Sequence, residues 1–309
     1  MSDTPQSPTH GRIVVGTDLS PRTGPAIEWA AKRADAAGVP LLVTLVVPPG
    51  PLLLRNGIDD AAIVADIGRH LHDRGEQKLA DEKARIAQAH PDLVVETRLY
   101  EGDTISTLAD ATDSAALVVV GARGSTMPIA IPAVGGTSDA LVTRARGPVA
   151  VVTDAVQATA GGPVVVGVDD SPASVEALRV AVDEALALGV GVEAIHAWDV
   201  GPWMADMLVG WSVDQATMGG TLESMMDALI SPYAQEHPHL RIERRLVPGR
   251  ASDVLGSASE GASLLVVGSR GRGGLAGLFF GSTSREVLRR AKCPVIVVRA
   301  PGEEPAAGH

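Results

Sequence analysis

A glycine-rich segment near the C-terminal end of the chain has the residue types of a phosphate-binding loop. Residues 268–274 read Gly-Ser-Arg-Gly-Arg-Gly-Gly, and Gly-Ser-Thr follows at 281–283. Glycines permit turns with positive φ and let the backbone approach a ligand closely. The arginines supply positive charge, and the hydroxyls supply donors where a helix with free N–H groups is expected to begin. The segment therefore predicts a cradle for an anion such as a phosphate group.

A carboxylate is expected to face this cradle. Asp169 follows the apolar run 164–168, and the glycine-rich segment follows the apolar run 264–267. If both runs are strands of a parallel α/β sheet, their carboxyl ends meet at the edge where such sheets bind ligands. The sequence therefore predicts a single crevice that contains both features.

The elements that position these residues occur twice in the chain. Three pairs of segments match in the same order: 13–21 with 164–172, 117–124 with 264–271, and 147–152 with 293–298. Ordered repeats of this kind indicate a duplicated domain. We expect domains at 11–153 and 162–300, with disordered tails at 1–10 and 301–309.

Each copy alternates short apolar runs with longer helical patterns. In the second copy the expected strands are 164–168, 192–197, 242–247, 264–267 and 295–298. The expected helices are 173–188, a region within 214–236, 252–260 and 283–291. The apolar runs are continuous, as in strands covered on both faces. The alternation predicts an α/β fold with a five-stranded, parallel, doubly wound sheet in each copy.

Three other motifs fit the sequence less well. Residues 271–276 match a dinucleotide fingerprint, but that motif belongs after the first strand of its unit. Residues 277–282 resemble a P-loop without its lysine. Asp169-Asp170 suggests a phosphorylated receiver domain, but the aspartate and lysine expected after the third and fifth strands are missing.

The combined pattern resembles the universal stress protein family in its tandem form, over residues 11–153 and 162–300. The ATP-binding pattern of that family is Gly-x2-Gly-x9-Gly-(Ser/Thr), and it is matched by Gly268, Gly271, Gly281 and Ser282. The resemblance implies two Rossmann-like domains of the adenine nucleotide alpha hydrolase type. It also implies that the ligand is ATP, with or without Mg²⁺.

The resemblance assigns further residues of the second copy to the pocket. Asp169 corresponds to the first-strand aspartate beside the adenosine, and Ala197 to a second-strand residue whose backbone meets the adenine. Val267, Gly268 and Thr283 would complete the pocket.

The first copy departs from the family pattern. Its corresponding positions are Asp18, Val46, Gly121, Gly124, Gly135 and Thr137. Ten residues separate Gly124 from Gly135, where the pattern has nine, and Gly136 replaces the hydroxyl residue Ser282. We therefore expect weaker binding in the first copy.

The composition of the chain argues against nucleic acids and membranes as binding partners. The net charge of −11 argues against a nucleic-acid-binding protein, which needs a basic face. A single cysteine, Cys293, excludes an intramolecular disulfide. The first ten residues lack the apolar core of a signal peptide. The most apolar stretch cannot be one continuous membrane-spanning helix, because it is interrupted by Pro40, Pro48, Pro49 and Pro51. We expect a cytoplasmic protein that binds neither membranes nor nucleic acid.

No nucleophile–base pair or metal cluster stands out in the sequence, so we expect no catalytic residues and no metal ligands. The leading hypothesis is a nucleotide-dependent sensor or regulator in the stress response, acting on unknown protein partners. The alternatives are a slow ATPase or nucleotidyl transferase, and a dimerisation scaffold with vestigial pockets. We also expect a homodimer, and pairing of the two copies of one chain through the apolar strands 149–152 and 295–298.

Overall fold

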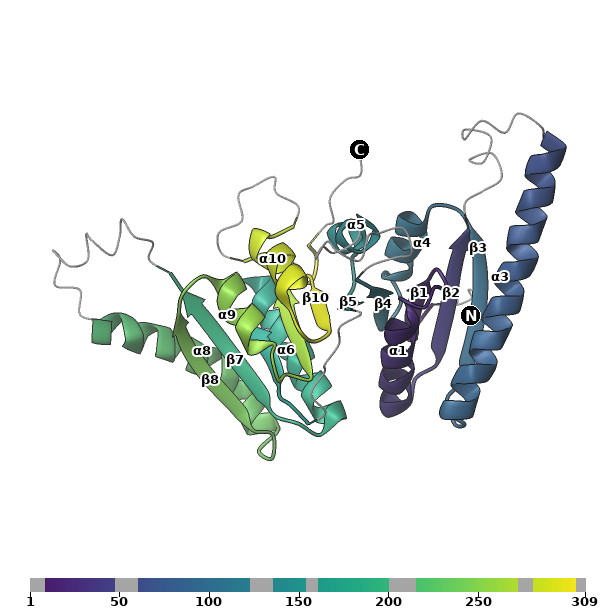
Figure 1. Ribbon diagram of the computed structural model, residues 1–309. Helices are drawn as coiled ribbons and strands as arrows, with labels where there is room; N and C mark the ends of the chain where they lie inside the picture. Colours follow the sequence, from purple (N-terminus) through teal and green to yellow (C-terminus); the bar gives the residue numbers. More distant parts are fainter. Residues whose placement is uncertain are drawn as a thin grey trace, which may run out of the picture. The chain divides into compact units, whose positions relative to one another are not determined.

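The computed structural model of the protein describes residues 9–47, 61–122, 136–153, 161–199, 215–271 and 280–303 (Figure 1). The chain divides into two compact units between Asp154 and Ala155. The first unit contains β1 (Ile13–Thr17), α1 (Gly24–Ala37), β2 (Leu41–Val47), α3 (Ala61–Ala89), β3 (Val95–Glu101), α4 (Thr104–Ala111), β4 (Leu117–Gly121), α5 (Gly136–Arg144) and β5 (Val149–Val152).

The second unit repeats the same order of elements. It contains β6 (Val164–Gly167), α6 (Pro172–Leu188), β7 (Val192–Trp198), α8 (Gln215–Glu236), β8 (Ile242–Pro248), α9 (Ala251–Ala258), β9 (Leu264–Gly268), α10 (Ser282–Arg290) and β10 (Val295–Val298). These bounds agree with the expected strands and helices of the second copy to within two residues at each end, except in the loosely bounded region around α8.

All strand pairs within each unit are parallel, which confirms the predicted fold. The order is β3-β2-β1-β4-β5 in the first unit and β8-β7-β6-β9-β10 in the second. The direction of the winding reverses between β1 and β4, and between β6 and β9. The carboxyl ends at these two reversals are where a doubly wound sheet opens a ligand crevice.

Helices cover both faces of each sheet. In the first unit, Gly75 of α3 lies against Leu45 and Leu99. Leu108 of α4 lies against Gly16, on the opposite face. Right-handed crossovers produce this division, because the chain winds outward from β1 in one direction and then returns to wind in the other.

The inner strands are built from buried valine, leucine and alanine, as the continuous apolar runs predict. The prediction of cover on both faces is wrong for the outer strand β8, where Glu243, Arg244 and Arg245 are exposed. An edge strand tolerates these charges because one of its sides has no neighbouring strand within the unit. Arg245 pairs with Glu193 of β7, and Arg244 pairs with Asp227 of α8.

Local sequence signals explain where α6 begins and ends. The Ser171 hydroxyl accepts a hydrogen bond from the Ser174 backbone N–H, and Pro172 occupies the first helical position. Gly189 ends the helix with a φ of 65°. The corresponding helix of the first unit, α1, begins only at Gly24, although the sequence aligns Ser20-Pro21 with Ser171-Pro172.

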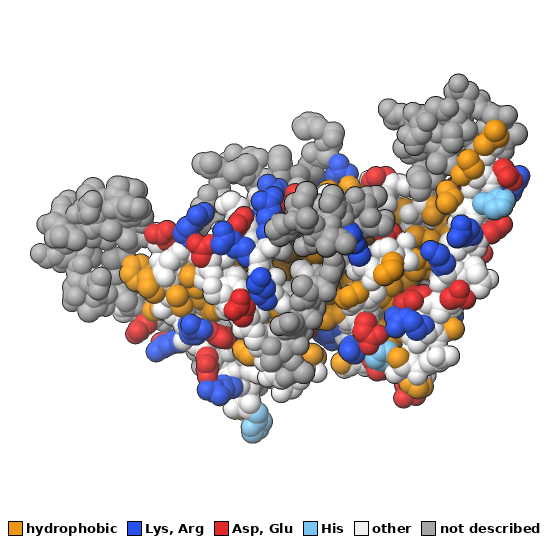
Figure 2. Space-filling view, viewed as in Figure 1, with side chains coloured by type: hydrophobic (Ala, Val, Ile, Leu, Met, Phe, Trp, Pro, Cys, Tyr) orange, Lys and Arg blue, Asp and Glu red, His pale blue; other side chains and the backbone are white. Residues whose placement is uncertain are grey.

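The long helix α3 carries exposed apolar side chains as well as buried ones. Leu79 and Ile86 are buried against the sheet, whereas Ile63 and Leu71 are exposed. Figure 2 shows a row of apolar side chains along this helix. Among the described helices, none is long and apolar enough to cross a membrane.

Candidate functional site

A cleft opens in the second unit at the carboxyl ends of β6 and β9, where the winding reverses. Its empty volume is about 510 Å³, which includes open solvent at its mouth. It is lined by Gly167, Val168, Asp169, Ser174, Ile195, Ala197, Ala251, Leu255, Val267, Gly268, Arg270, Gly271, Thr283 and Ser284. Six of the eight residues predicted for the second copy therefore lie together in one cleft.

Asp169 shapes the turn between β6 and α6. Its Oδ1 accepts hydrogen bonds from the Ser171 hydroxyl at 2.6 Å and from the Ser171 backbone N–H at 3.1 Å. Its own N–H donates to Ser174 Oγ at 3.2 Å. Asp170 takes a φ of 60°, which short polar residues tolerate in tight turns. The half-buried carboxylate is thus oriented by the turn that also caps α6.

Gly271 lies directly against this carboxylate. A β-carbon on Gly271 would lie well under 3.0 Å from Asp169 Oδ2, closer than real β-carbons approach another atom. A β-carbon on Gly268 would lie 2.9 Å from the backbone carbon of Ala173. Neither glycine, nor Gly281, has a positive φ. Of the two properties for which glycine is favoured here, the one these three positions use is close approach between segments.

The N-terminus of α10 lies beside the cleft. Gly281 is the N-cap residue and has no side chain to cap the helix. Its N–H donates to the Ser269 carbonyl at 2.9 Å. This bond connects the start of the helix to the glycine-rich segment that begins at Gly268, hereafter the glycine loop. The first helical N–H groups have no acceptor within the helix, and together with the helix dipole they favour an anion. The side chains of Ser282 and Thr283 are exposed there, and Thr283 lines the cleft.

The other side of the cleft is apolar. Ala197 and Val267 lie at the ends of β7 and β9. Ile195 and Leu255 are buried beneath the cleft. The site therefore combines an apolar wall with a carboxylate and an anion-favouring rim, an arrangement suited to a ligand with a flat apolar part and a negatively charged part.

The corresponding region of the first unit is only partly described. Gly124 and Gly135 lie outside the described residues. Asp18, Val46, Gly121 and Thr137 lie at the ends of β1, β2 and β4 and in the first turn of α5, as the repeat predicts. Asp18 is exposed, and its Oδ1 accepts from the Ser20 N–H at 2.9 Å.

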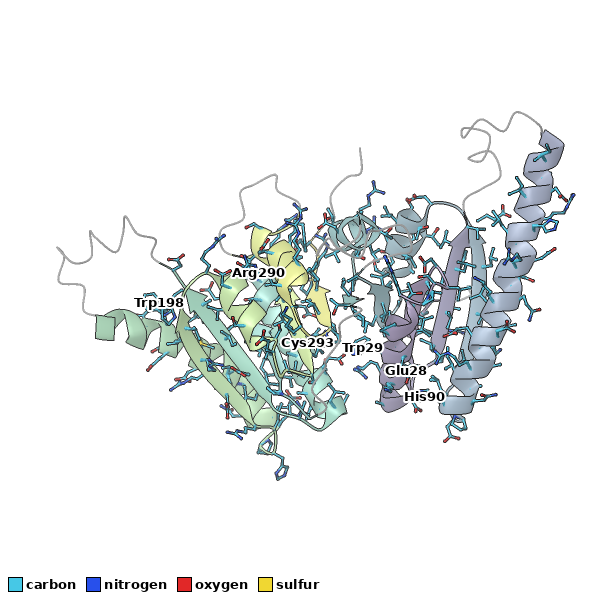
Figure 3. All side chains as sticks on the ribbon, in the orientation of Figure 1. Glu28, Trp29, His90, Trp198, Arg290 and Cys293 are labelled. Atoms are coloured by element: carbon cyan, nitrogen blue, oxygen red, sulfur yellow. The ribbon has the colours of Figure 1, made fainter. Side chains whose placement is uncertain are left out.

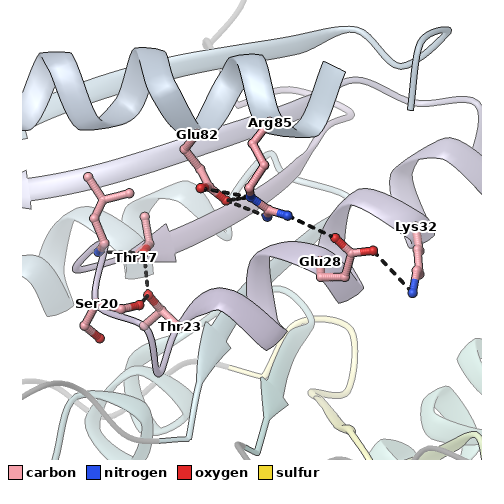
Figure 4. A network of polar contacts seen from close by, with 8 residues as sticks. Thr17, Ser20, Thr23, Glu28, Lys32, Glu82 and Arg85 are labelled. Atoms are coloured by element: carbon pink, nitrogen blue, oxygen red, sulfur yellow. Dashed lines mark hydrogen bonds and ion pairs between the residues drawn. The ribbon is translucent and has the colours of Figure 1, made fainter. Parts of the chain in front are cut away.

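The turn that follows β1 also has its own hydrogen bonds. Thr17 and Thr23 share a hydrogen bond of 2.7 Å between their hydroxyls, seen in Figure 4. The Leu19 backbone N–H donates to the Thr17 hydroxyl at 2.8 Å. This local network accompanies the later start of α1, so the two repeats differ in structure beside their aspartates.

Sequence reasoning missed one pair of serines. Ser284 of α10 donates to the Gly268 carbonyl at 2.6 Å, and Ser138 of α5 donates to the Gly121 carbonyl at 2.7 Å. Both bonds join the first turn of the last helix to the end of the fourth strand. The signal was present, because the two serines match at the same repeat offset as the last strands.

Two residues with potentially reactive side chains, His196 and Cys293, are buried. His196 is buried, and its Nδ1 donates to the Val168 carbonyl at 2.7 Å, as expected for a core histidine. Cys293, labelled in Figure 3, is fully buried just before β10. Burial raises the pKa of its thiol to about 12, so it remains a protonated, unreactive thiol at neutral pH.

These features define a class of protein: two tandem doubly wound α/β domains, at least one with a cleft at the switch point. The sequence model of the universal stress protein family matches residues 9–153 and 162–299. The chain therefore belongs to the universal stress protein family.

Individual relatives agree with this assignment. The chain is 33% identical to the universal stress protein Rv1996 of Mycobacterium tuberculosis, with 95% of this chain and 96% of that protein covered. A crystal structure of a universal stress protein from Archaeoglobus fulgidus has the same fold, with a TM-score of 0.64, 19% identity and coverage of 94% of this chain and 97% of that chain. Two single-domain matches, each covering 44% of this chain with a TM-score of 0.33, are universal stress proteins in complex with cAMP and with dAMP; the identities are 27% and 25%.

Proposed function

We propose that the second domain binds ATP in the cleft between β6 and β9, and that the protein acts as a nucleotide-dependent regulator in the stress response. The observation that carries the proposal is the contact between Gly271 and Asp169. It brings the glycine-rich segment next to the carboxylate, so that one ligand could contact both.

Each part of the cleft has a role in this proposal. The apolar wall at Ala197 and Val267 would receive the adenine, and the Asp169 carboxylate would accept a hydrogen bond from the nucleoside. The backbone of the loop and the N-terminus of α10 would face the phosphates, where N–H groups and the helix dipole favour negative charge. Thr283 and Ser282 would add hydroxyl donors. Mg²⁺, if it accompanies ATP, would neutralise phosphate charge.

We propose a binding role rather than catalysis. Among the described lining residues of the cleft, Asp169 is the one acidic residue, and it accepts a hydrogen bond from Ser171. A hydrolytic site needs a group that activates water, and Asp169 is held as an acceptor by the turn instead. We further propose that the first domain binds nucleotide more weakly, and that the protein is a cytoplasmic homodimer with protein partners.

The proposal is tested by titrating the purified full-length protein with Mg-ATP in a calorimeter, then incubating it for hours and identifying the nucleotide after denaturation. Saturable binding with intact ATP supports a regulator. Conversion to ADP or AMP supports the slow enzyme. Absence of binding supports a scaffold, and sedimentation measures the dimer separately.

A further inference from the structure

The end of the second domain folds back onto the glycine loop. After β10 the chain makes a turn over Ala300-Pro-Gly-Glu303, in which the Glu303 N–H donates to the Ala300 carbonyl at 3.0 Å. Proline at the second position and Gly302, with a φ of 79°, are the residues that a type II turn favours. The turn is thus encoded locally, and it delivers the Glu303 side chain to the loop.

The Glu303 carboxylate accepts hydrogen bonds from Ser269, Arg299 and Ala300, and it forms an ion pair with Arg270. Its oxygens lie 3.2 and 3.3 Å from Ser269 Oγ, and Oε1 lies 3.0 Å from Arg270 Nε. Oε1 also lies 3.3 Å from Arg299 Nη1, and Oε2 accepts from the Ala300 N–H at 3.2 Å. Ser269 and Arg270 are the two residues between Gly268 and Gly271, so the contacts fall on the first half of the loop.

The ion pair between Glu303 and Arg299 is largely buried, so the loss of either charge would be costly. The Arg299 side chain is 2% exposed and that of Glu303 is 13% exposed. Burial lowers the pKa of Arg299, and Glu303 opposes that shift. Removing the carboxylate would leave a buried guanidinium without this counter-ion, which is costly. Glu303 therefore contributes a counter-charge to Arg299 beside the loop.

We propose that Glu303 is a positioning residue of the nucleotide site: its carboxylate fixes Ser269 and Arg270, and so holds the loop in the form that faces the phosphates. This inference rests on the proposed ATP site. Because Glu303 acts on the phosphate side, it controls affinity for ATP and leaves affinity for adenosine unchanged.

The decisive variant is Glu303→Gln, which keeps the shape and the acceptor oxygen but removes the charge. Glu260→Gln is the matched control, because Glu260 is an exposed glutamate in the same domain, just after α9. Two measurements are made on the full chain: hydrogen exchange of the backbone at 268–271 without ligand, and calorimetric titration with ATP and with adenosine.

We expect Glu303→Gln to speed exchange at 268–271 and to weaken ATP binding about fivefold or more, with adenosine unaffected. The control variant should change neither. In a chain that already carries Arg270→Gln, Glu303→Gln should lower ATP affinity by a smaller factor than it does in the native chain. The reason is that the effects of two residues in one network are not additive. Gly302→Ala, which strains the turn without changing charge, should act in the same direction as Glu303→Gln.

Three results would overturn the inference. Unchanged exchange at 268–271 would show that Glu303 does not hold the loop. Tighter ATP binding by Glu303→Gln would show that the carboxylate merely repels phosphate. If the native protein binds no ATP, the proposed function and this role in affinity both fail, while the exchange measurement still reports whether Glu303 braces the loop.

Discussion

Gly271 and Asp169, which are 102 positions apart in the sequence, lie so close that a β-carbon on Gly271 would collide with Asp169 Oδ2. The first comes after β9 and the second after β6, so the contact spans the switch point of the second sheet. The other carboxylate oxygen of Asp169 is held by Ser171. The absence of a side chain at Gly271 therefore leaves the aspartate its place, and the two residues form one unit of the cleft.

Gly271→Ala is predicted to damage the cleft more than the fold. The added methyl group would push the Asp169 carboxylate aside, and a side-chain end can move at little cost to the core. We expect ATP affinity to fall about tenfold, or about 1.4 kcal/mol, with a small change in melting temperature.

Gly220→Ala is the control for that variant. Gly220 lies in α8 with nothing within 4 Å of the added β-carbon. Alanine there should stabilise the protein by about 0.5–1 kcal/mol and leave ATP binding unchanged. Equal ATP affinity in Gly271→Ala and the native protein would contradict the assigned contact.

Asp169→Ala and Asp169→Asn are predicted to separate two roles of this residue. The asparagine variant would keep an oxygen for Ser171 but would lose the charge, so the turn should survive. We expect both variants to weaken ATP binding by about 1.5–3 kcal/mol, and Asp169→Ala alone to lower the melting temperature as well.

The comparison for Asp169 is Asp18→Ala, the equivalent change in the first domain, with ATP affinity and melting temperature measured in parallel. A large drop in melting temperature at unchanged ATP affinity in Asp169→Ala would mean that Asp169 serves the turn and not the ligand.

The fold and most residues of the cleft could be predicted from the sequence, for a physical reason. Buried parallel strands need continuous apolar runs, and Ser171-Pro172 and Gly189 specify the ends of α6 almost alone. The doubly wound order then places Asp169 beside Gly271 without any further information.

Features that depend on contacts between distant segments were not predictable in this way. Glu303 lies in a stretch that composition alone assigns to a disordered tail, and its role depends on buried Arg299. The later start of α1 is accompanied by a Thr17–Thr23 hydrogen bond, which no repeat alignment reveals. The sequence could not show which property of glycine Gly268, Gly271 and Gly281 use, and in the structure it is close approach between segments and not a positive φ.

The two domains are predicted to contribute unequally to ATP binding. A β-carbon added to Gly281 would lie 3.1 Å from the Ser269 carbonyl oxygen. Gly281→Val should therefore displace the start of α10. The same substitution at Gly135, its repeat counterpart, should matter less. Calorimetry should therefore give a tight site that is lost in Gly281→Val and kept in Gly135→Val. Equal losses in the two variants would show that the longer first loop still forms a competent site.

Cys293 is predicted to make stability fall at alkaline pH. Burial raises the thiol pKa to about 12 in the folded protein, whereas an unfolded thiol has a pKa of about 8.5. Between these values the unfolded chain loses the proton and the folded protein does not, so the thiol favours unfolding as pH rises. The contribution to the slope should approach about 1.4 kcal/mol per pH unit.

Urea unfolding at several pH values between about 8 and 10.5 measures this effect. Cys293→Ala should have a flatter profile than the native protein over that range, whatever its absolute stability. Identical slopes in the two proteins would show that the thiol is accessible to solvent in the folded state.

ATP binding in the cleft between β6 and β9 is tested most directly by calorimetric titration of the full-length protein with ATP, repeated on a variant that combines Asp169→Asn with Gly271→Ala. We expect saturable binding to the native protein and a loss of about a hundredfold or more in the variant, which should remain folded by circular dichroism. Native affinity in this folded variant would contradict binding in this cleft, because the nucleotide would then have to bind elsewhere.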